Sequence, residues 1–454
     1  MSDIIIAILA VIFVLGVAIN IHELGHFLFA KLFGMRVEAY SFFGLGPRVF
    51  GFKVGHTDYR VSAIPLGAYV KLYGDDGAGP LEAKDATAEP VPESELYELR
   101  PRWQKFFVMI GGPLMNFVLA FFIPFGIALV SGVPANPSPI VGRVQAGGAA
   151  EVAGLKPGDR IVKVNGIDNP SWGRITDEAL LMPERPVPFV IERDGQRIDI
   201  SVTPSRVSAS GQSAGILEMA PDPGAVPVVV GQIDPSMPAA SSGLQRGDWI
   251  LAVNGTTLRN PNDMVDIITK SNGAPIELQV DRGGQRVGVT ITPVDRGSGW
   301  RVGVGFDESL LSVKEPVGIG GAASFALEQN LRILRVTGAA LFQVGTGERS
   351  ARDTVSGPIG IVQAIVNQVR IAGFDGLLLI LMAISLSLGV MNLLPIPMLD
   401  GGQIMVLGIE KLLSWFGRTL SLAARERIQL TGLAIVLLLM VTVTFLDVSR
   451  LFGK

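Results

Sequence analysis

Three polar residues within one short stretch of the chain, His22, Glu23 and His26, have the types and spacing to do chemistry together. On a helix, residues four positions apart share a face, so the two imidazoles can bind a single Zn²⁺ ion. The carboxylate of Glu23 then lies beside the metal, where it can take a proton from a bound water molecule. This H-E-x-x-H pattern predicts a hydrolytic zinc site with Glu23 as its base.

The alternative for this pattern is the end of a soluble helix whose histidines and glutamate face water. The context argues against it, because the pattern follows an apolar, uncharged run from Ile4 to Ile21. An ionisable residue inside a membrane costs roughly 2.5–3.5 kcal/mol on insertion scales and is usually functional. Three such residues within five positions therefore favour a metal site.

A third metal ligand has to come from elsewhere, since catalytic zinc sites use three protein ligands and leave one position open. The chain has three histidines and no cysteine, which leaves only His56 besides the pair in the motif. A carboxylate is then expected, and Asp400 in the segment NLLPIPMLDGG is the candidate. The alternative is that Asp400 and Gly401 form a turn that merely ends a helix.

Membrane-spanning helices are the elements that must position these residues. With 48% hydrophobic and 17% charged residues, the chain is too apolar for a soluble protein of 454 residues. Four uncharged runs are long enough, or nearly so, to cross a bilayer: Ile4–Ile21, Phe106–Val130, Gly376–Met398 and Leu430–Leu446. No basic residue precedes the first run, which indicates a retained span rather than a cleaved signal peptide. A net charge of −3 argues against nucleic acid as a partner.

Basic residues at the ends of the spans predict the orientation, because Lys and Arg collect on the cytoplasmic side. They follow span one, precede span two and separate spans three and four: Lys31, Arg36, Arg100, Arg102, Lys105, Lys411, Arg418, Arg425 and Arg427. Both termini and the long stretch between spans two and three are therefore expected outside the cytoplasm, with the metal site near the cytoplasmic side.

The stretch between spans two and three contains an internal repeat. Residues 142–166 and 231–255 align without a gap at an offset of 89 residues and share ten identities of 25. A period this long indicates a domain duplicated in tandem rather than a solenoid. The repeated pattern, G-L-x-x-G-D followed by I-x-x-V-N-G, resembles the PDZ domain, which predicts α+β domains over residues 135–222 and 223–309.

The resemblance to exported bacterial PDZ domains implies that the carboxylate-binding loop lies at the end of each copy. The candidates are Gly215 and Ile216 in the first copy and Gly305 and Phe306 in the second. Backbone N–H groups of such loops hold a peptide terminus while the peptide adds a strand to a sheet edge. Glycine-containing turns without a ligand are the alternative.

The remaining segments predict smaller elements. Asp75–Glu98 is rich in Asp, Glu, Ala and Pro and has the composition of a disordered loop. Tyr59–Tyr73 has β-branched and aromatic residues interrupted by Pro65 and Gly67, which suggests a hairpin close to the membrane. Ala322–Val344 and Ile359–Ile371 look like amphipathic helices at the outer membrane face.

Taken together, HELGH in span one, NLLPIPMLDGG in span three and tandem PDZ copies between spans two and three resemble the site-2 protease family. GPLMNF, residues 112–117 in span two, also matches a family motif. The resemblance covers nearly the whole chain. It implies one Zn²⁺ per chain, held by His22, His26 and Asp400, and an enzyme of the bacterial inner membrane with periplasmic PDZ domains.

The family's activity implies cleavage of a single-pass membrane protein within or near its transmembrane segment, after another protease has removed the exported part. An anti-sigma factor and remnant signal peptides are the substrate classes implied, with membrane lipid as the surroundings. Asn392, Gly67 and Pro397 are the residues expected to bind unwound substrate backbone. The alternative role of Asn392, packing or satisfying its own helix end near the prolines, stays open.

The expected architecture is a multi-pass α-helical membrane protein with four transmembrane helices and two exported PDZ-like domains. Its parts are a first helix with the zinc motif, a cytoplasmic loop, a second helix, the two domains, amphipathic periplasmic helices, and a third and fourth helix: residues 1–34, 35–105, 106–131, 135–222, 223–309, 320–372, 374–402 and 428–448.

Two rival functions are a membrane PDZ scaffold with a non-catalytic metal site and a transporter with a broken helix. The intact Glu23 argues against the scaffold, and the lack of an inverted repeat argues against the transporter.

Overall fold

The computed structural model describes residues 2–42, 44–64, 67–74, 91–209, 212–295, 297, 299–306 and 314–452. They form two compact units. Unit 1 contains the two ends of the chain, up to Val130 and from Val317 onward, and unit 2 consists of Ser131–Ala209 and Ser213–Pro316. Helices make up about half of the chain. The expected α-helical class therefore describes unit 1, whereas unit 2 is built mainly of strands.

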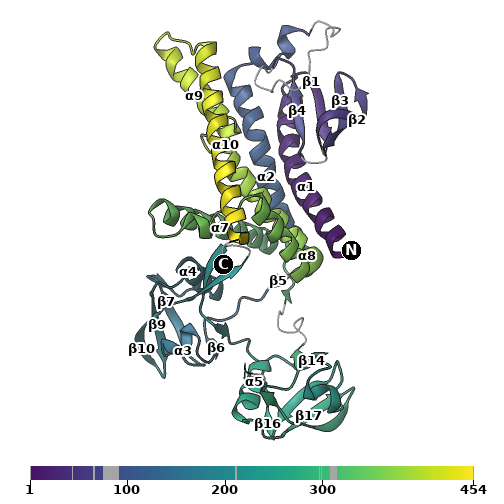
Figure 1. Cartoon of the computed structure of the whole chain (residues 1–454), viewed down its shortest axis with the longest axis vertical. Helices are drawn as coiled ribbons and strands as arrows, with labels where there is room; N and C mark the ends of the chain where they lie inside the picture. The colour runs from purple at the N-terminus through teal and green to yellow at the C-terminus, as the bar shows by residue number, and fades with distance from the viewer. Residues whose placement is uncertain are drawn as a thin grey trace. The chain divides into compact units, whose positions relative to one another are not determined.

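Four helices of unit 1 are long and apolar enough to cross a membrane. They are α1 (Ser2–Leu32), α2 (Arg102–Ser131), α8 (Pro358–Asn392) and α10 (Leu422–Phe452) (Figure 1). Each contains an apolar stretch of 18 residues with at most two charged residues, as is typical of helices surrounded by lipid or other helices. Val14 of α1 and Leu381 of α8 lie in a buried cluster that also contacts α2.

Helix α8 bends at Gly373, whose backbone is not helical (φ 54°, ψ −130°). The bend separates an N-terminal part from the apolar part of α8, and α7 (Ile319–Gly345) precedes both. The expectation of one transmembrane element over 374–402 is wrong, because α8 ends at Asn392 and a new helix, α9 (Asp400–Trp415), begins at Asp400. Pro395 and Pro397 account for the break, since proline cannot continue the hydrogen-bond ladder of a helix.

A four-stranded sheet follows α1 in the chain. Its strands are β1 (Val37–Phe42), β2 (Leu45–Val54), β3 (Thr57–Ile64) and β4 (Tyr69–Leu72), in the spatial order β2-β3-β1-β4. The expected hairpin over Tyr59–Tyr73 is therefore wrong, because β3 and β4 lie on opposite sides of β1. The hairpin is formed instead by β2 and β3, which are joined by a tight turn at Gly55 and His56.

The expected disorder of Asp75–Glu98 does not hold over its last part. Two short 3-10 helices, η1 (Glu93–Glu95) and η2 (Tyr97–Leu99), lie there, and Arg36 donates a hydrogen bond of 2.6 Å to Glu95. Tyr97 packs into a buried cluster with Met35. Residues 75–90 lie outside the described part of the chain.

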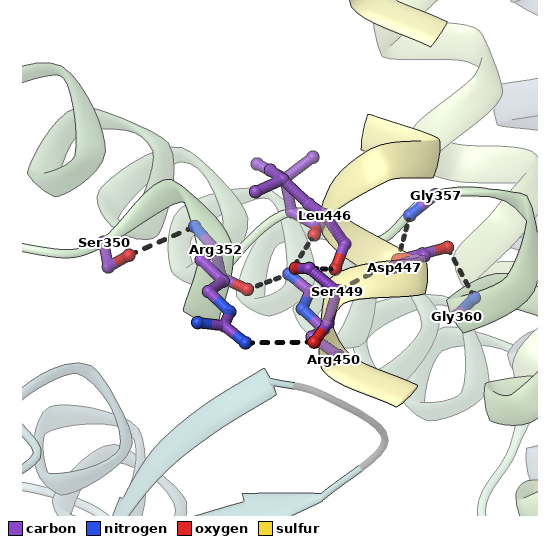
Figure 2. Close-up of polar contacts among 9 residues, drawn as sticks. Ser350, Arg352, Gly357, Gly360, Leu446, Asp447, Ser449 and Arg450 are labelled. Atoms are coloured by element: carbon purple, nitrogen blue, oxygen red, sulfur yellow. Dashed lines mark hydrogen bonds and ion pairs between the residues drawn. The ribbon is translucent and has the colours of Figure 1, made fainter. Parts of the chain in front are cut away.

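The end of α10 is tied to the start of α8. Asp447 accepts hydrogen bonds of 3.0 and 2.9 Å from the backbone N–H groups of Gly357 and Gly360, as Figure 2 shows. Arg450, one turn along α10, donates to the carbonyl of Val355 at 2.6 Å and forms an ion pair of 3.0 Å with Asp447. The carboxylate thus satisfies N–H groups that a helix start leaves without intrahelical partners.

Unit 2 contains two domains with the same order of elements. The first is built from β6 (Val141–Val144), α3 (Ala149–Val152), β7 (Arg160–Val164), β8 (Ile167–Asp168), α4 (Trp172–Leu181), β9 (Val187–Arg193), β10 (Gln196–Val202), β11 (Ser205–Ala209), β12 (Gln212–Ile216) and β13 (Met219–Pro221). The second is built from β14 (Val228–Ile233), η3 (Pro238–Ser241), β15 (Trp249–Val253), β16 (Thr256–Thr257), α5 (Pro261–Lys270), β17 (Ile276–Arg282), β18 (Gln285–Ile291), β19 (Val294–Asp295), β20 (Trp300–Arg301) and β21 (Val304–Phe306). Short strands β5 (Val133–Pro134) and β22 (Lys314–Glu315) pair where unit 2 begins and ends.

The duplication extends to individual polar contacts. Arg193 pairs with Asp159 in the first domain at 2.6 Å, and Arg282 pairs with Asp248 in the second, also at 2.6 Å. The two pairs are 89 residues apart in the chain, which is the offset between the sequence repeats. Each domain has its own buried apolar core, around Phe189 in the first and Ile250 in the second.

Candidate metal centre

Three side chains from two separated parts of the chain converge on one point in unit 1. His22 and His26 lie on α1, and Asp400 is the first residue of α9. The Nε2 atoms of the two histidines are 3.2 Å apart, and Asp400 oxygens lie 3.1 Å from His22 Nε2 and 3.5 Å from His26 Nε2. All three side chains are largely buried.

These distances fit a tetrahedral zinc ion. Ligand atoms about 2.0–2.1 Å from such an ion lie roughly 3.3 Å from one another, close to the three separations observed. Within the described part of the chain, the Oδ2 atom of Asp400 is buried and accepts no hydrogen bond, although it is 3.1 Å from His22 Nε2. Two imidazole nitrogens and a carboxylate oxygen that converge on one point are a donor set for a cation.

The second nitrogen of each imidazole is held by helix α2. His26 Nδ1 lies 2.7 Å from the carbonyl oxygen of Val108, and His22 Nδ1 lies 3.1 Å from the side-chain amide of Asn116. A carbonyl can only accept, so Nδ1 of His26 carries the ring proton and Nε2 keeps the lone pair that a metal requires. Contacts of this kind fix the tautomer and orientation of metal-binding histidines.

Glycines allow α2 to approach the histidines this closely. A Cβ atom at Gly112 would lie 2.4 Å from His26 Nε2 and 2.8 Å from His22 Nε2. On α1, a Cβ at Gly25 would lie 2.0 Å from the carbonyl oxygen of Gly111. Any side chain at these positions would push the two helices apart, so the ligand geometry depends on these glycines.

Asp400 is placed by a tight loop between α8 and α9. Met398 in this loop has a positive φ of 86°, a region that residues with a Cβ rarely adopt. A Cβ at Gly401 would lie 2.3 Å from the carbonyl of Leu393, and one at Gly402 would lie 2.2 Å from that of Ile396. The two glycines after Asp400 therefore let the loop fold back against the start of α9.

Glu23 lines the same cavity as the ligands, which has a volume of about 380 Å³. Its Oε2 atom accepts a hydrogen bond of 3.1 Å from the backbone N–H of Val70 in β4. Strand β4 is at the edge of its sheet and pairs only with β1, so N–H groups on its other side are open to partners such as Glu23. Burial raises the pKa of Tyr40, and the nearby charge of Glu23 raises it further, so the Tyr40 hydroxyl stays protonated.

Of the three residues expected to bind substrate, only Asn392 lines this cavity. Asn392 lines the cavity together with His22, His26 and Asp400. Gly67 is not among the described residues that line it, but Tyr69 and Val70, which follow closely in the chain, are. Pro397 faces α10 instead, where a Cβ at Gly432 would lie 2.2 Å from it.

The expected peptide-binding loops of unit 2 also differ between the two domains. Gly305 and Phe306 are in β21, which pairs with β14, and they line a groove beside α5. Gly215 and Ile216 lie in β12, and a Cβ at Gly215 would come within 2.1 Å of the carbonyl of Ala179. Close packing against α4 thus explains the glycine in the first domain, without any ligand.

The sequence did not assign individual residues of α2 to the site, although Gly112 and Asn116 lie in the motif GPLMNF. Val108, Gly112 and Asn116 all face the histidine pair, and their spacing of four residues on α2 is the signal that predicts a shared face. The backbone N–H of Val70 could not have been found, because its role depends on where β4 lies in the sheet.

Comparison with known proteins places the chain in a family. A family model described as "Peptidase family M50" matches residues 10–439. The chain belongs to peptidase family M50. The resemblance to the site-2 proteases is thereby confirmed, and the protein is a metalloprotease.

Relatives match over nearly the full length. The chain is 30% identical to the regulator of sigma-E protease RseP of Escherichia coli, over 96% of this chain and 97% of that protein. It is 29% identical to a putative zinc metalloprotease of Vibrio cholerae, over 99% of this chain and 100% of that protein. A solved PDZ domain of an SdrC-like protein from Listeria monocytogenes is 20% identical, with a TM-score of 0.17, over 19% of this chain and 93% of that domain.

Proposed function

We propose that this metalloprotease is a zinc endopeptidase that cuts single-pass membrane proteins within or near their transmembrane segment. The observation that carries the proposal is the convergence of His22, His26 and Asp400 on one point, at a helix that is itself apolar enough to span a membrane. The three ligand atoms all lie within 4.8 Å of one another, and Glu23 lines the same cavity.

A zinc ion held by these residues would supply a Lewis acid able to activate water and polarise the scissile carbonyl. Glu23 takes the proton from the attacking water and passes it to the amine that leaves. The hydrogen bond from Val70 to Oε2 holds the carboxylate of Glu23 in place. His22, His26 and Asp400 would supply the three protein ligands of the metal.

A substrate helix must unwind before it can be cut, because its carbonyl groups are engaged in its own hydrogen bonds. Asn392 lies in the cavity and offers a side-chain amide to the freed backbone. Strand β4 presents an open edge next to Glu23, to which an extended segment could pair. Gly67 permits the chain to turn into β4 with a φ of 93°, and Pro397 shapes the loop before Asp400.

The relatives named regulators of sigma-E protease suggest the class of substrate. We assign a membrane-anchored anti-sigma factor, already shortened by a first cut, and remnant signal peptides. The protein then works in the bacterial inner membrane. We assign its two repeated domains as periplasmic PDZ domains, and the basic residues at the ends of the four spans support that orientation. We further propose that these domains exclude substrates with bulky exported parts.

The test is cleavage of a tagged single-pass substrate that lacks its exported domain, in the same membranes, by the wild type and by Glu23→Gln. Bound zinc is quantified in both proteins. The wild type should cut, and the variant should be inert but loaded with zinc. Equal processing by both would show that another enzyme cuts and would overturn the proposal.

Deletion of residues 135–309 tests the exclusion of uncut substrate. The shortened protein should cleave a substrate that still carries its exported domain, which the full chain leaves intact. Continued protection of the uncut substrate would contradict this role, provided that the shortened protein still cleaves the shortened substrate.

A further inference from the structure

A buried chain of hydrogen-bonding groups leads away from the candidate metal centre. Asn116 on α2 lies between His22 on α1 and Ser385 on α8. The amide nitrogen of Asn116 is 3.1 Å from His22 Nδ1, and Ser385 Oγ is 3.2 Å from Asn116 Oδ1 and 3.1 Å from its main-chain oxygen. Asn116 and Ser385 are both 0% exposed, so water does not substitute for either partner.

The direction of the Asn116 amide decides whether His22 can bind a metal. A neutral imidazole carries one ring proton, and coordination through Nε2 requires that this proton sit on Nδ1. Nδ1 then needs an acceptor in front of it. An amide nitrogen only donates, so the orientation with the nitrogen towards His22 favours the proton on Nε2, where it blocks coordination.

The two ends of a carboxamide have nearly the same shape, and only the hydrogen-bond network distinguishes them. We infer that Asn116 presents its amide oxygen to His22 Nδ1–H when zinc is bound, and that Ser385 selects this direction. In that arrangement the Asn116 amide nitrogen donates to Ser385 Oγ, and the Ser385 hydroxyl donates to the main-chain oxygen of Asn116. Every contact then has one donor and one acceptor.

The opposite direction is less well satisfied. The single hydroxyl proton of Ser385 would face two acceptors, the side-chain and the main-chain oxygen of Asn116. His26 needs no such selection, because its Nδ1 partner is the carbonyl of Val108. Asn116 and Ser385 are thus positioning residues that act on zinc through His22.

Close packing preserves this link between three helices. A Cβ at Gly389, one turn beyond Ser385 on α8, would lie 3.3 Å from the Cβ of Asn116. The helices are therefore tightly packed at Asn116, and because this side chain is 0% exposed, the direction of its amide is set by its partners and not by solvent.

The inference rests on the proposed zinc site and is tested by the zinc affinity of the full-length protein, measured by competition with a fluorescent zinc chelator. Asn116→Leu keeps the size of the side chain and removes the acceptor, so zinc should bind 10–100-fold more weakly, the range for groups that support a ligand. Asn116→Asp keeps an acceptor in either direction and should bind zinc about as tightly as the wild type.

Ser385→Ala removes one oxygen and should also weaken zinc binding in the wild-type protein. The same change should have little effect in the Asn116→Asp background, because a carboxylate has no amide end to orient. Thermal unfolding of each variant reports on packing. A purely structural role would predict that Asp and Leu at position 116 weaken zinc binding alike.

Four outcomes separate the possibilities. Zinc bound by Asn116→Leu as tightly as by the wild type, or by Asn116→Asp as weakly as by Asn116→Leu, overturns the inference. If Asn116→Leu does not fold, Ser385→Ala decides, and an unchanged zinc affinity in that variant overturns it. A wild type that binds no zinc would refute the proposed function itself.

Discussion

The carboxylate of Asp447, near the end of α10, accepts a hydrogen bond of 3.0 Å from the backbone N–H of Gly357, 90 residues earlier in the chain. Asp447 is only 3% exposed. A buried carboxylate is costly unless its oxygens are hydrogen-bonded, and here Gly357, Gly360 and Arg450 supply the donors. The contact joins the last helix of unit 1 to the start of the helix that leads to Asn392 and Asp400.

Replacement of Asp447 by asparagine should therefore destabilise unit 1. The amide can accept from one of the two glycines but not from both, and it loses the charge that pairs with Arg450. Hydrogen bonds to charged groups contribute about 1.5–3 kcal/mol each, and we expect a loss of that order. Unfolding in a denaturing detergent measures it. Ser449→Ala is the matched control on the same turn, and an equal loss in both variants would contradict the role of the carboxylate.

Gly112→Ala should weaken zinc binding at least tenfold. The new methyl group would lie 2.4 Å from His26 Nε2, which is too close for any atom, so the imidazoles or α2 must move. Metal sites tolerate such displacement poorly. Gly126→Ala, on the same helix but with no atom within 4 Å of the new Cβ, is the control and should leave zinc binding unchanged. Unaltered zinc affinity in Gly112→Ala would show that the observed approach of α2 is wrong.

Val70→Pro should slow cleavage while leaving zinc in place. Proline has no N–H, so the hydrogen bond to Glu23 Oε2 is lost, and an edge strand tolerates proline where its N–H points outward. The lost charge-assisted bond corresponds to a decrease in rate of roughly 10–100-fold. Val70→Ala keeps the N–H and should cleave normally. Simultaneous loss of zinc would mean that β4 supports the ligands rather than Glu23.

The sequence predicted the parts of the site that depend on local spacing. His22 and His26 share a helix face, and Asp400 follows a proline-containing helix end, so each could be found from neighbouring residues. The start of a separate helix at Asp400 was missed, because a proline pair shows that a helix breaks but not that another begins. The strand order was also missed, since β3 and β4 are close in the chain yet are separated in space by β1. Asn116 belonged to a recognised motif, but its contact with His22 depends on how α1 and α2 pack.

The second domain of unit 2 should lose stability in acid through Asp248. The hydrogen-bonded Arg282 guanidinium holds the pKa of Asp248 below its ordinary value. The unfolded chain, with a pKa near 4 for this carboxyl, therefore binds the proton more readily than the folded domain. The contribution of the pair is complete above about pH 5 and is lost as the pH falls through the lowered pKa of the folded state.

Amide hydrogen exchange of β15 and β17, corrected for the intrinsic exchange rates, measures this loss between pH 6 and pH 3. Strand β17 ends at Arg282, and strand β15 begins at Trp249, the residue after Asp248. Asp248→Asn has no such carboxyl, so its protection should already be lower at pH 6 and should decline less on acidification. A decline of equal size in the variant and the wild type would assign the acid sensitivity to other carboxylates, because only the difference between the two proteins reports on Asp248.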